Sequence, residues 1–151
     1  MADRPAVRRV SFQVEPWDEH GGHELVPYVD GVRLLDLVST YERAARFDVA
    51  GQYAGLVLDH FNYGDLTEYL TGEPGYAFGD KPGTIALLGC DCGEVGCWPF
   101  LAQVVLDNDL VTWRDFAQPN RPKRDYGHLG PFTFARTQYL KAIRTLTEQL
   151  E

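Results

Sequence analysis

The stretch that most constrains the fold spans residues 84–112 and contains all three cysteines of the chain. Its first part, Thr84–Gly89, is an apolar run short enough for a buried strand. Two further apolar runs, Phe100–Leu106 and Leu110–Phe116, flank the polar residues 107–109, and this arrangement predicts a tight hairpin. The stretch therefore predicts an antiparallel meander whose first connection bears the cysteines.

Two further strands are predicted near the N-terminus. Val10, Phe12 and Val14 alternate with polar residues, and a period of two predicts a half-buried strand over Arg8–Glu15. Leu25–Val29 predicts a second strand, at an edge of the sheet because it contains a proline.

Helical spacing of apolar residues predicts two longer helices, Val32–Phe47 and Phe132–Leu150, with Thr133 as the cap of the second. Between them, Asp65 and Glu68 have the spacing of a capping box, which predicts the start of a short helix.

These elements predict an α+β fold, with helices packed on one face of a mainly antiparallel sheet. The strands come in hairpin-like pairs, and the helices do not alternate strictly with them. At 151 residues the chain is large enough for a hydrophobic core, and we expect a single domain over residues 1–151. Segments rich in proline and glycine, 73–83 and 117–131, predict loops.

Two aromatic residues of one predicted strand lie on opposite faces if the strand is regular. Trp113 shares a face with Val111, whereas Phe116 shares the other with Thr112. We therefore expect both aromatics in the core only if both faces of the sheet are covered.

The charge of the chain is unevenly distributed. The formal net charge is -8, and residues 10–80 contain 13 acidic residues against three arginines. An acidic surface repels phosphate backbones, so nucleic-acid binding is disfavoured. The small basic cluster of Arg121, Lys123 and Arg124 is interpreted as part of a solvated turn.

The apolar segments indicate neither membrane insertion nor secretion. No run approaches the roughly 18 apolar residues of a membrane span, and the N-terminal sequence lacks the apolar region of a signal peptide. We therefore expect a cytoplasmic protein, where reducing conditions favour thiols or metal ligands over disulfides.

The cysteine segment has the sequence G-C-D-C-G-E-V-G-C-W-P. In an extended backbone Cys90 and Cys92 lie on the same face, because they are two residues apart. Gly93 and Gly96 allow the chain to bend back toward Cys97, since glycine adopts positive φ without steric cost. The spacing thus allows the three sulfur atoms to meet.

Three thiolates suit zinc, and a closed structural site needs a fourth ligand. We expect His128 to supply it, because its loop leads to the last predicted helix; Asp91 and Glu94 are alternatives. Two other interpretations stay open. The cysteines can be small buried residues in a tight turn, or they can form a redox pair using Cys90, Cys92 or Cys97.

The acidic residues beside the thiols argue against an activated nucleophile, because negative charge raises a thiol pKa. Asp59-His60 together with a cysteine would suit a Cys–His hydrolase only if the groups are in hydrogen-bond contact. His20 and His23 are interpreted as solvated loop residues. The chain contains no Walker loop, G-x-S-x-G or H-E-x-x-H motif.

The runs LLGCDCGEVGCWPFLAQV, VTWRDFAQPNRP and YGHLGPFTFARTQY resemble a family of small bacterial proteins without an established activity. Members carry a similar G-C-x-C-G-x-x-G-C-W-P core, a W-x-x-F-x-Q-P segment and a G-P-F-x-F start of the last helix. The resemblance covers roughly residues 87–140. It implies a shared fold and no particular reaction.

Three functional hypotheses follow from these observations. The first is a non-enzymatic domain that binds another protein, with a cysteine turn that can hold structural zinc. The second is a thiol-dependent redox protein or enzyme that uses the cysteine cluster. The third is a toxin-neutralising protein whose acidic half covers a basic partner.

Overall fold

The computed structural model describes residues 6–17, 21–60, 62–73 and 81–150, which form two sheets and three α-helices. The larger sheet contains, in spatial order, β1 (Val7–Arg8), β10 (Phe132–Ala135), β9 (Leu110–Ala117), β8 (Phe100–Leu106), β7 (Thr84–Cys90) and β5 (Tyr53–Ala54). The smaller sheet contains β2 (Val10–Pro16), β3 (His23–Val29), β4 (Val32–Arg33) and β6 (Leu56–Val57). Every strand pair is antiparallel except β1 with β10.

The predicted meander is confirmed as the centre of the larger sheet. β7 pairs with β8, and β8 pairs with β9, both in the antiparallel sense. The apolar residues of β7 are buried throughout, as expected of a strand covered on both faces.

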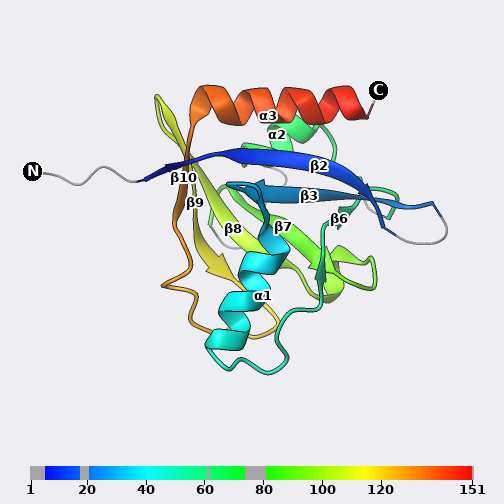
Figure 1. Ribbon diagram of the computed structural model, residues 1–151, viewed down its shortest axis with the longest axis vertical. Coiled ribbons are helices and arrows are strands. Elements are labelled where there is room, and N and C mark those ends of the chain that lie inside the picture. The colour runs from blue at the N-terminus through cyan, green and yellow to red at the C-terminus, as the bar shows by residue number, and fades with distance from the viewer. Residues whose placement is uncertain (1–5, 18–20, 61, 74–80, 151) are drawn as a thin grey trace, which may run out of the picture.

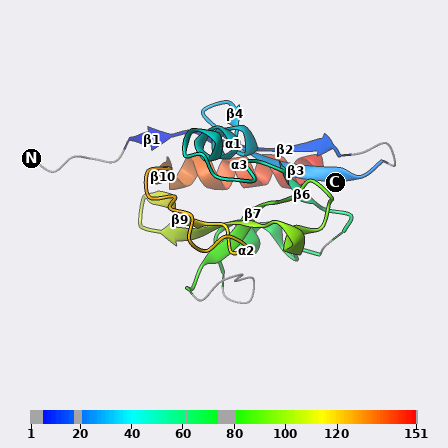
Figure 2. The same cartoon turned by 90° about the horizontal axis from the view of Figure 1, so that it is seen from below.

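The two sheets lie as stacked layers, and α3 (Arg136–Gln149) runs along one end of both (Figures 1 and 2). It packs on β2 and on the short α2 (Leu66–Leu70), whereas α1 (Leu34–Ala44) packs on β3. The α+β class is therefore confirmed, but the protein is rich in strands and has a second sheet that the sequence pattern did not predict. That residues 1–151 form one domain stays a prediction.

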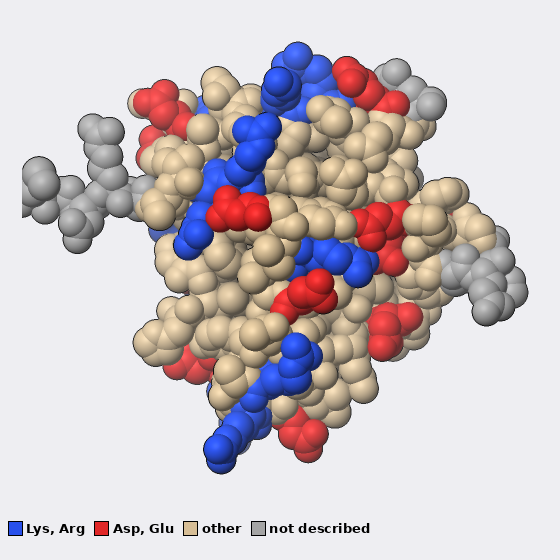
Figure 3. All heavy atoms as spheres, in the orientation of Figure 1, with Lys and Arg blue, Asp and Glu red and all other residues tan. Residues whose placement is uncertain are grey.

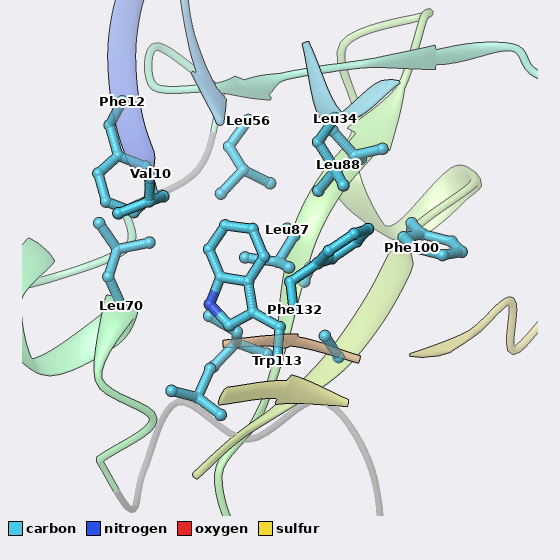
Figure 4. Packing of buried hydrophobic residues seen from close by; sticks show 14 of the residues in the cluster. Val10, Phe12, Leu34, Leu56, Leu70, Leu87, Leu88, Phe100, Trp113 and Phe132 are labelled. Atoms are coloured by element: carbon cyan, nitrogen blue, oxygen red, sulfur yellow. The ribbon is translucent and has the colours of Figure 1, made fainter. Parts of the chain in front are cut away.

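Trp113 lies at the centre of the core (Figure 4) and has no exposed surface. Its ring centroid is 6.3 Å from that of Phe12 in β2 and 4.8 Å from that of Phe134 in β10. Its indole Nε1 donates to the Tyr139 hydroxyl at 3.1 Å, and that hydroxyl donates to the Leu70 carbonyl at 2.5 Å. One buried cluster thus connects both sheets with α2 and α3.

The start of the last helix was predicted wrongly. Residues 132–135 form β10, and the helix begins at Arg136 with Ala135 as its N-cap. Thr133 is not a cap: it is buried and pairs with Thr112 of β9, with their hydroxyl oxygens 3.3 Å apart. Pairing with β9 outweighs the helical spacing of the apolar residues, because tertiary contacts override local propensity.

A bulge in β9 places both of its aromatics in the core. Gln103 pairs with Arg114 and Leu101 with Ala117, so β9 has one residue more than β8 between these pairs. Asp115 takes up the extra residue with a φ of 52°. Phe116 therefore faces the same side as Trp113, contrary to the regular alternation that the sequence predicted, and its ring stacks on Phe100 at 5.7 Å.

Asp65 is confirmed as the N-cap of α2, because its Oδ1 accepts a hydrogen bond from the Glu68 backbone N–H at 3.0 Å. Gly72 follows α2 with a φ of 75°, a conformation that favours glycine. Most of the predicted loop 73–83 lies outside the described residues. Within the described chain, no helix combines the length and the apolar character needed to cross a membrane.

Candidate metal centre

The cysteine turn, residues 90–97, begins where β7 ends and closes with a short 3₁₀ helix, Val95–Cys97. The Gly93 N–H donates to the Cys90 carbonyl at 2.9 Å, and the Cys97 N–H donates to the Glu94 carbonyl at 3.1 Å. Val95 is buried and anchors the turn in the core. The backbone of the turn is thus fixed by its own hydrogen bonds and by one apolar side chain.

Gly93 allows two aromatic side chains to cover the outer bend of the turn. A Cβ at this position would lie 2.7 Å from both His60 Nδ1 and Trp17 Cη2, and its φ is 96°. His60 Nδ1 is 3.1 Å from the Gly93 carbonyl oxygen, and the Trp17 ring packs edge-on against the imidazole. The lack of space for a Cβ and the positive φ together explain why a glycine occupies this position.

The turn brings the sulfur atoms of Cys90, Cys92 and Cys97 within 4.8 Å of one another. Cys90 is half-buried, whereas Cys92 and Cys97 are exposed. In a tetrahedral zinc site with bonds of about 2.3 Å, sulfur atoms lie roughly 3.8 Å apart. The group therefore fits a metal ion after a small inward movement of the side chains.

The three thiols differ in acidity. Hydrogen bonds lower the pKa of Cys92: the largest effect comes from the Glu94 backbone and a smaller one from the Cys90 side chain. Burial raises the pKa of Cys90 to about 12, and the hydrogen bond with Cys92 raises the pKa of Cys97. The nearby acids do oppose ionisation, as the sequence argument expected, but at Cys92 the hydrogen bonds outweigh them.

The predicted fourth ligand, His128, is not part of this group. It is exposed in the loop between β9 and β10, where its neighbour Tyr126 is buried against Tyr41 and Phe47. The residue of this loop that does reach the cysteine turn is Asn120, whose Nδ2 donates to the Cys97 carbonyl at 2.6 Å. Because its loop is anchored through Tyr126, His128 does not join the three sulfur atoms.

Among the described residues, the other acidic and histidine side chains near the turn are not members of the sulfur group either. The group contains no carboxylate, so neither Asp91 nor Glu94 completes it, although Asp91 Oδ1 is 3.7 Å from Cys90 Sγ. His23 lies beside Asp59, with 3.9 Å between Nδ1 and Oδ2. His20 lies outside the described residues. Among the residues that are described, the group thus offers three ligands, all of them thiols.

A buried acid beside this region was missed by the sequence analysis. Glu42 of α1 has no exposed surface and accepts hydrogen bonds from the Gly51 N–H at 2.8 Å, the Tyr53 hydroxyl at 2.7 Å and the Tyr126 hydroxyl at 2.6 Å. The guanidinium of Arg124 is 3.3 Å from the same carboxylate. We call Glu42, Tyr53, Tyr126 and Arg124 the Glu42 network.

The spacing along α1 contained a signal for this burial. Leu34, Val38 and Glu42 recur every four residues and are the buried residues of the helix. An acid at that spacing is usually assigned to the solvated face, which is why the pattern was not recognised.

Trp98 connects the cysteine turn with the Glu42 network. Its Nε1 donates to the Gly51 carbonyl at 2.9 Å, and the guanidinium groups of Arg121 and Arg124 lie 5.0 and 5.6 Å from its ring. Since Trp98 directly follows Cys97, the turn and the loop that carries the basic cluster are in contact.

Comparison of the chain with protein-family models, with curated proteins and with solved structures finds no match. The resemblance of residues 87–140 to a bacterial family stays a prediction.

Proposed function

We propose that this protein is a non-enzymatic, protein-binding domain whose cysteine turn holds a zinc ion through Cys90, Cys92 and Cys97. The observation that carries the proposal is the proximity of the three sulfur atoms, within 4.8 Å of one another. Thiolates are preferred zinc ligands, and the short loop between them already has the necessary bend. Water or a side chain of the partner completes the coordination.

The surroundings favour a structural role over a catalytic one. Among the described residues, no histidine belongs to the sulfur group. Asp91 Oδ1 accepts from the Cys90 thiol at 3.7 Å, but burial raises the pKa of that thiol, so the contact does not produce an activated nucleophile. His60, which packs against the turn from outside it, contacts the Gly93 carbonyl through its Nδ1. Because Cys92 and Cys97 are exposed, a metal ion bound to them would lie at the surface, where it would shape a recognition element.

Metal analysis of the full chain, purified without added zinc, tests the metal-binding part. We expect about one zinc per chain for the wild type and below about 0.1 for Cys92→Ser, because two thiolates do not retain the ion. Replacement of zinc by Co²⁺ should produce a thiolate-to-cobalt charge-transfer band in the wild type only.

His128→Ala is the matched control, since the structure keeps His128 out of the sulfur group. It should bind as much zinc as the wild type. A wild-type protein with less than about 0.1 zinc, and no cobalt band after addition of Co²⁺, would contradict the proposal.

A second candidate, a thiol–disulfide exchange protein, is favoured by the lowered pKa and exposure of Cys92. In this reaction the Cys92 thiolate attacks a disulfide of a substrate and releases one substrate thiol. Cys97 then loses its proton, attacks the mixed disulfide and releases the second thiol. The products are a Cys92–Cys97 disulfide and a substrate reduced by two electrons.

Alkylation kinetics distinguish this candidate from the first. In metal-free protein at neutral pH, Cys92 should react with iodoacetamide faster than a free thiol with a pKa of about 8.5. Mass spectrometry assigns the modified residue, and Cys92→Ser should lose the fast phase. Equal, slow reaction of all three thiols would exclude an exchange role.

The toxin-neutralising hypothesis gains no support from the acidic half of the chain, because several of its acids have internal partners. Glu15 pairs with Arg33 at 3.0 Å, and Glu24 Oε1 accepts the Gly55 N–H at 2.8 Å. Glu42 is buried in its own network. Glu15 and Glu42 are therefore already paired with a cation within the protein, and Glu24 is engaged by a backbone donor.

A further inference from the structure

A cleft of about 430 Å³ lies between the end of α1 and the loop that follows β9. Four of its lining residues are basic, namely Arg46, Arg121, Lys123 and Arg124, and one is acidic, Asp48. Figure 3 shows basic side chains on the lower part of one face, where α1 ends in Figure 1, and others on the middle and upper parts of the same face. The cleft is thus a locally basic site on a chain with a net charge of -8.

Three of the four cations have no acidic partner among the described residues. In the part of the chain that the structure describes, Arg46, Arg121 and Lys123 form no ion pair, whereas Arg124 is paired with the buried Glu42. Like charges held close together repel each other unless an anion neutralises them. The cleft thus has an unbalanced charge that a bound anion would compensate.

Two of the four basic groups, those of Arg121 and Arg124, are held by the surrounding structure. Arg124 is fixed from three directions, because its guanidinium contacts Glu42, the Tyr126 hydroxyl and the Val49 carbonyl. Its side chain is only 6% exposed. Arg121 lies over the Trp98 ring and donates to the Asn120 carbonyl at 2.9 Å. A ligand would therefore meet two guanidinium groups whose positions are already restricted, which reduces the entropic cost of binding.

The walls of the cleft also have apolar parts. Phe47 and Pro122 line it, and the Arg124 guanidinium lies 5.1 Å from the Phe47 ring centroid. A volume of this size is typical of sites for small molecules. A planar apolar group is thus a suitable occupant next to the charged groups.

We propose that this cleft binds the phosphate monoester of a small aromatic molecule. The phosphate dianion balances the unpaired Arg46, Arg121 and Lys123 better than the single charge of a carboxylate does, and arginine forks match phosphate oxygens. The aromatic body lies against Phe47 and Pro122. The sequence pattern alone indicates a solvated turn for Arg121, Lys123 and Arg124, whereas the structure shows that these residues form a cleft with the end of α1.

Titration calorimetry on the full chain with phenyl phosphate, inorganic phosphate, benzoate and phenol tests the proposal. Phenyl phosphate should bind saturably at low salt and more tightly than each of the other three probes, and its affinity should fall as salt is added. Equal affinities for phenyl phosphate and inorganic phosphate would overturn the aromatic part. Equal affinities for benzoate and phenyl phosphate would overturn the dianion part.

Single substitutions locate the site. Arg121→Ala and Lys123→Ala should each weaken phenyl phosphate binding by about tenfold or more, as expected for loss of a charged hydrogen bond. Arg144→Ala, which removes an exposed arginine of α3 outside the cleft, is the matched control and should bind as the wild type does. Absence of binding to the wild type, or equal weakening by all three substitutions, would refute the proposal.

Cys92→Ser separates this inference from the proposed metal site. The variant should retain phenyl phosphate binding, because the lining of the cleft contains no cysteine. Loss of binding in this variant would contradict an independent anion site.

Discussion

At the scale of single residues, Glu42 has the most unusual environment. A buried carboxylate loses its hydration, which is costly unless a cation and hydrogen bonds replace it. Here the replacements are Arg124 and the hydroxyl groups of Tyr53 and Tyr126, all within 3.3 Å of the same oxygen, while the Gly51 N–H contacts the other. The network connects α1, β5 and the loop after β9, so it holds together segments distant in the chain.

Glu42→Gln should destabilise the protein by about 3 kcal/mol, because it leaves the buried Arg124 without its counter-charge. Urea denaturation monitored by tryptophan fluorescence measures the free energy of unfolding. Glu148→Gln, at an exposed position of α3, is the matched control and should change it by less than about 0.5 kcal/mol. Similar values for both variants would show that the buried pair contributes nothing.

At the scale of elements, the bulge in β9 decides which residues face the core. Because of the extra residue at Asp115, Phe116 stacks on Phe100 and contacts Phe132 at a centroid distance of 5.7 Å. Asp115 has a positive φ and pairs with Lys81 at 3.2 Å on the surface. One extra residue thus changes the face of the sheet to which the last side chains of β9 point.

Deletion of Asp115 should cost at least about 3 kcal/mol, since a regular strand would turn Phe116 toward solvent and empty its place in the core. Asp115→Gly is the control: glycine adopts the positive φ, so the change should stay within about 1 kcal/mol. Thermal and urea unfolding compare the two. A deletion variant as stable as the glycine variant would rule out this role of the bulge.

The N-cap of α2 allows a second test at this scale. Asp65→Ala should destabilise the protein by about 1 kcal/mol, because the Glu68 N–H loses its acceptor. Asp65→Asn retains a cap and should be nearly neutral. Equal urea midpoints for the two variants would contradict the capping role.

At the scale of the whole molecule, buried tyrosine hydroxyls link the layers. Tyr139 of α3 donates to Leu70 at 2.5 Å, and Tyr69 of α2 donates to Ala86 of β7 at 2.5 Å. Burial raises the pKa of Tyr53, Tyr69 and Tyr139 above the ordinary value of 10, and it raises the pKa of Tyr126 to about 12. Ionisation of these hydroxyls is therefore opposed by the fold.

The raised pKa values of the buried tyrosines predict that the folded state loses stability at alkaline pH. Below pH 10 both the folded and the unfolded chain keep the phenol protons, so the full stability is present. As the pH rises from 10 toward 12, the unfolded chain loses protons that the folded chain retains, and stability falls, by up to about 2 kcal/mol for Tyr126 alone.

Urea denaturation at pH 8, 10 and 11 measures this loss. Tyr126→Phe removes one of the titrating groups, so it should lose less stability between pH 10 and 11 than the wild type does. A stability independent of pH over this range, or a steeper loss in the variant, would contradict the role of the buried tyrosines.

Interactions between residues close in the chain were predictable from the sequence. The hydrogen bond from the Glu68 N–H to the N-cap Asp65 spans three residues, and the hairpin of β8 and β9 spans a short polar turn. The proximity of the three cysteines is of the same kind, because they lie within eight residues and the glycines allow the bend. Local stereochemistry is enough to produce each of these features.

The features that tertiary structure alone decided depend on partners far along the chain. Residues 132–135 become a strand because β9 offers them a pairing edge, and Glu42 can be buried because Arg124 and Tyr126 reach it from more than 80 residues away. His128 stays away from the sulfur atoms because Tyr126 anchors its loop elsewhere. No local pattern encodes such contacts, since their free energy is released only when the distant segments pack together.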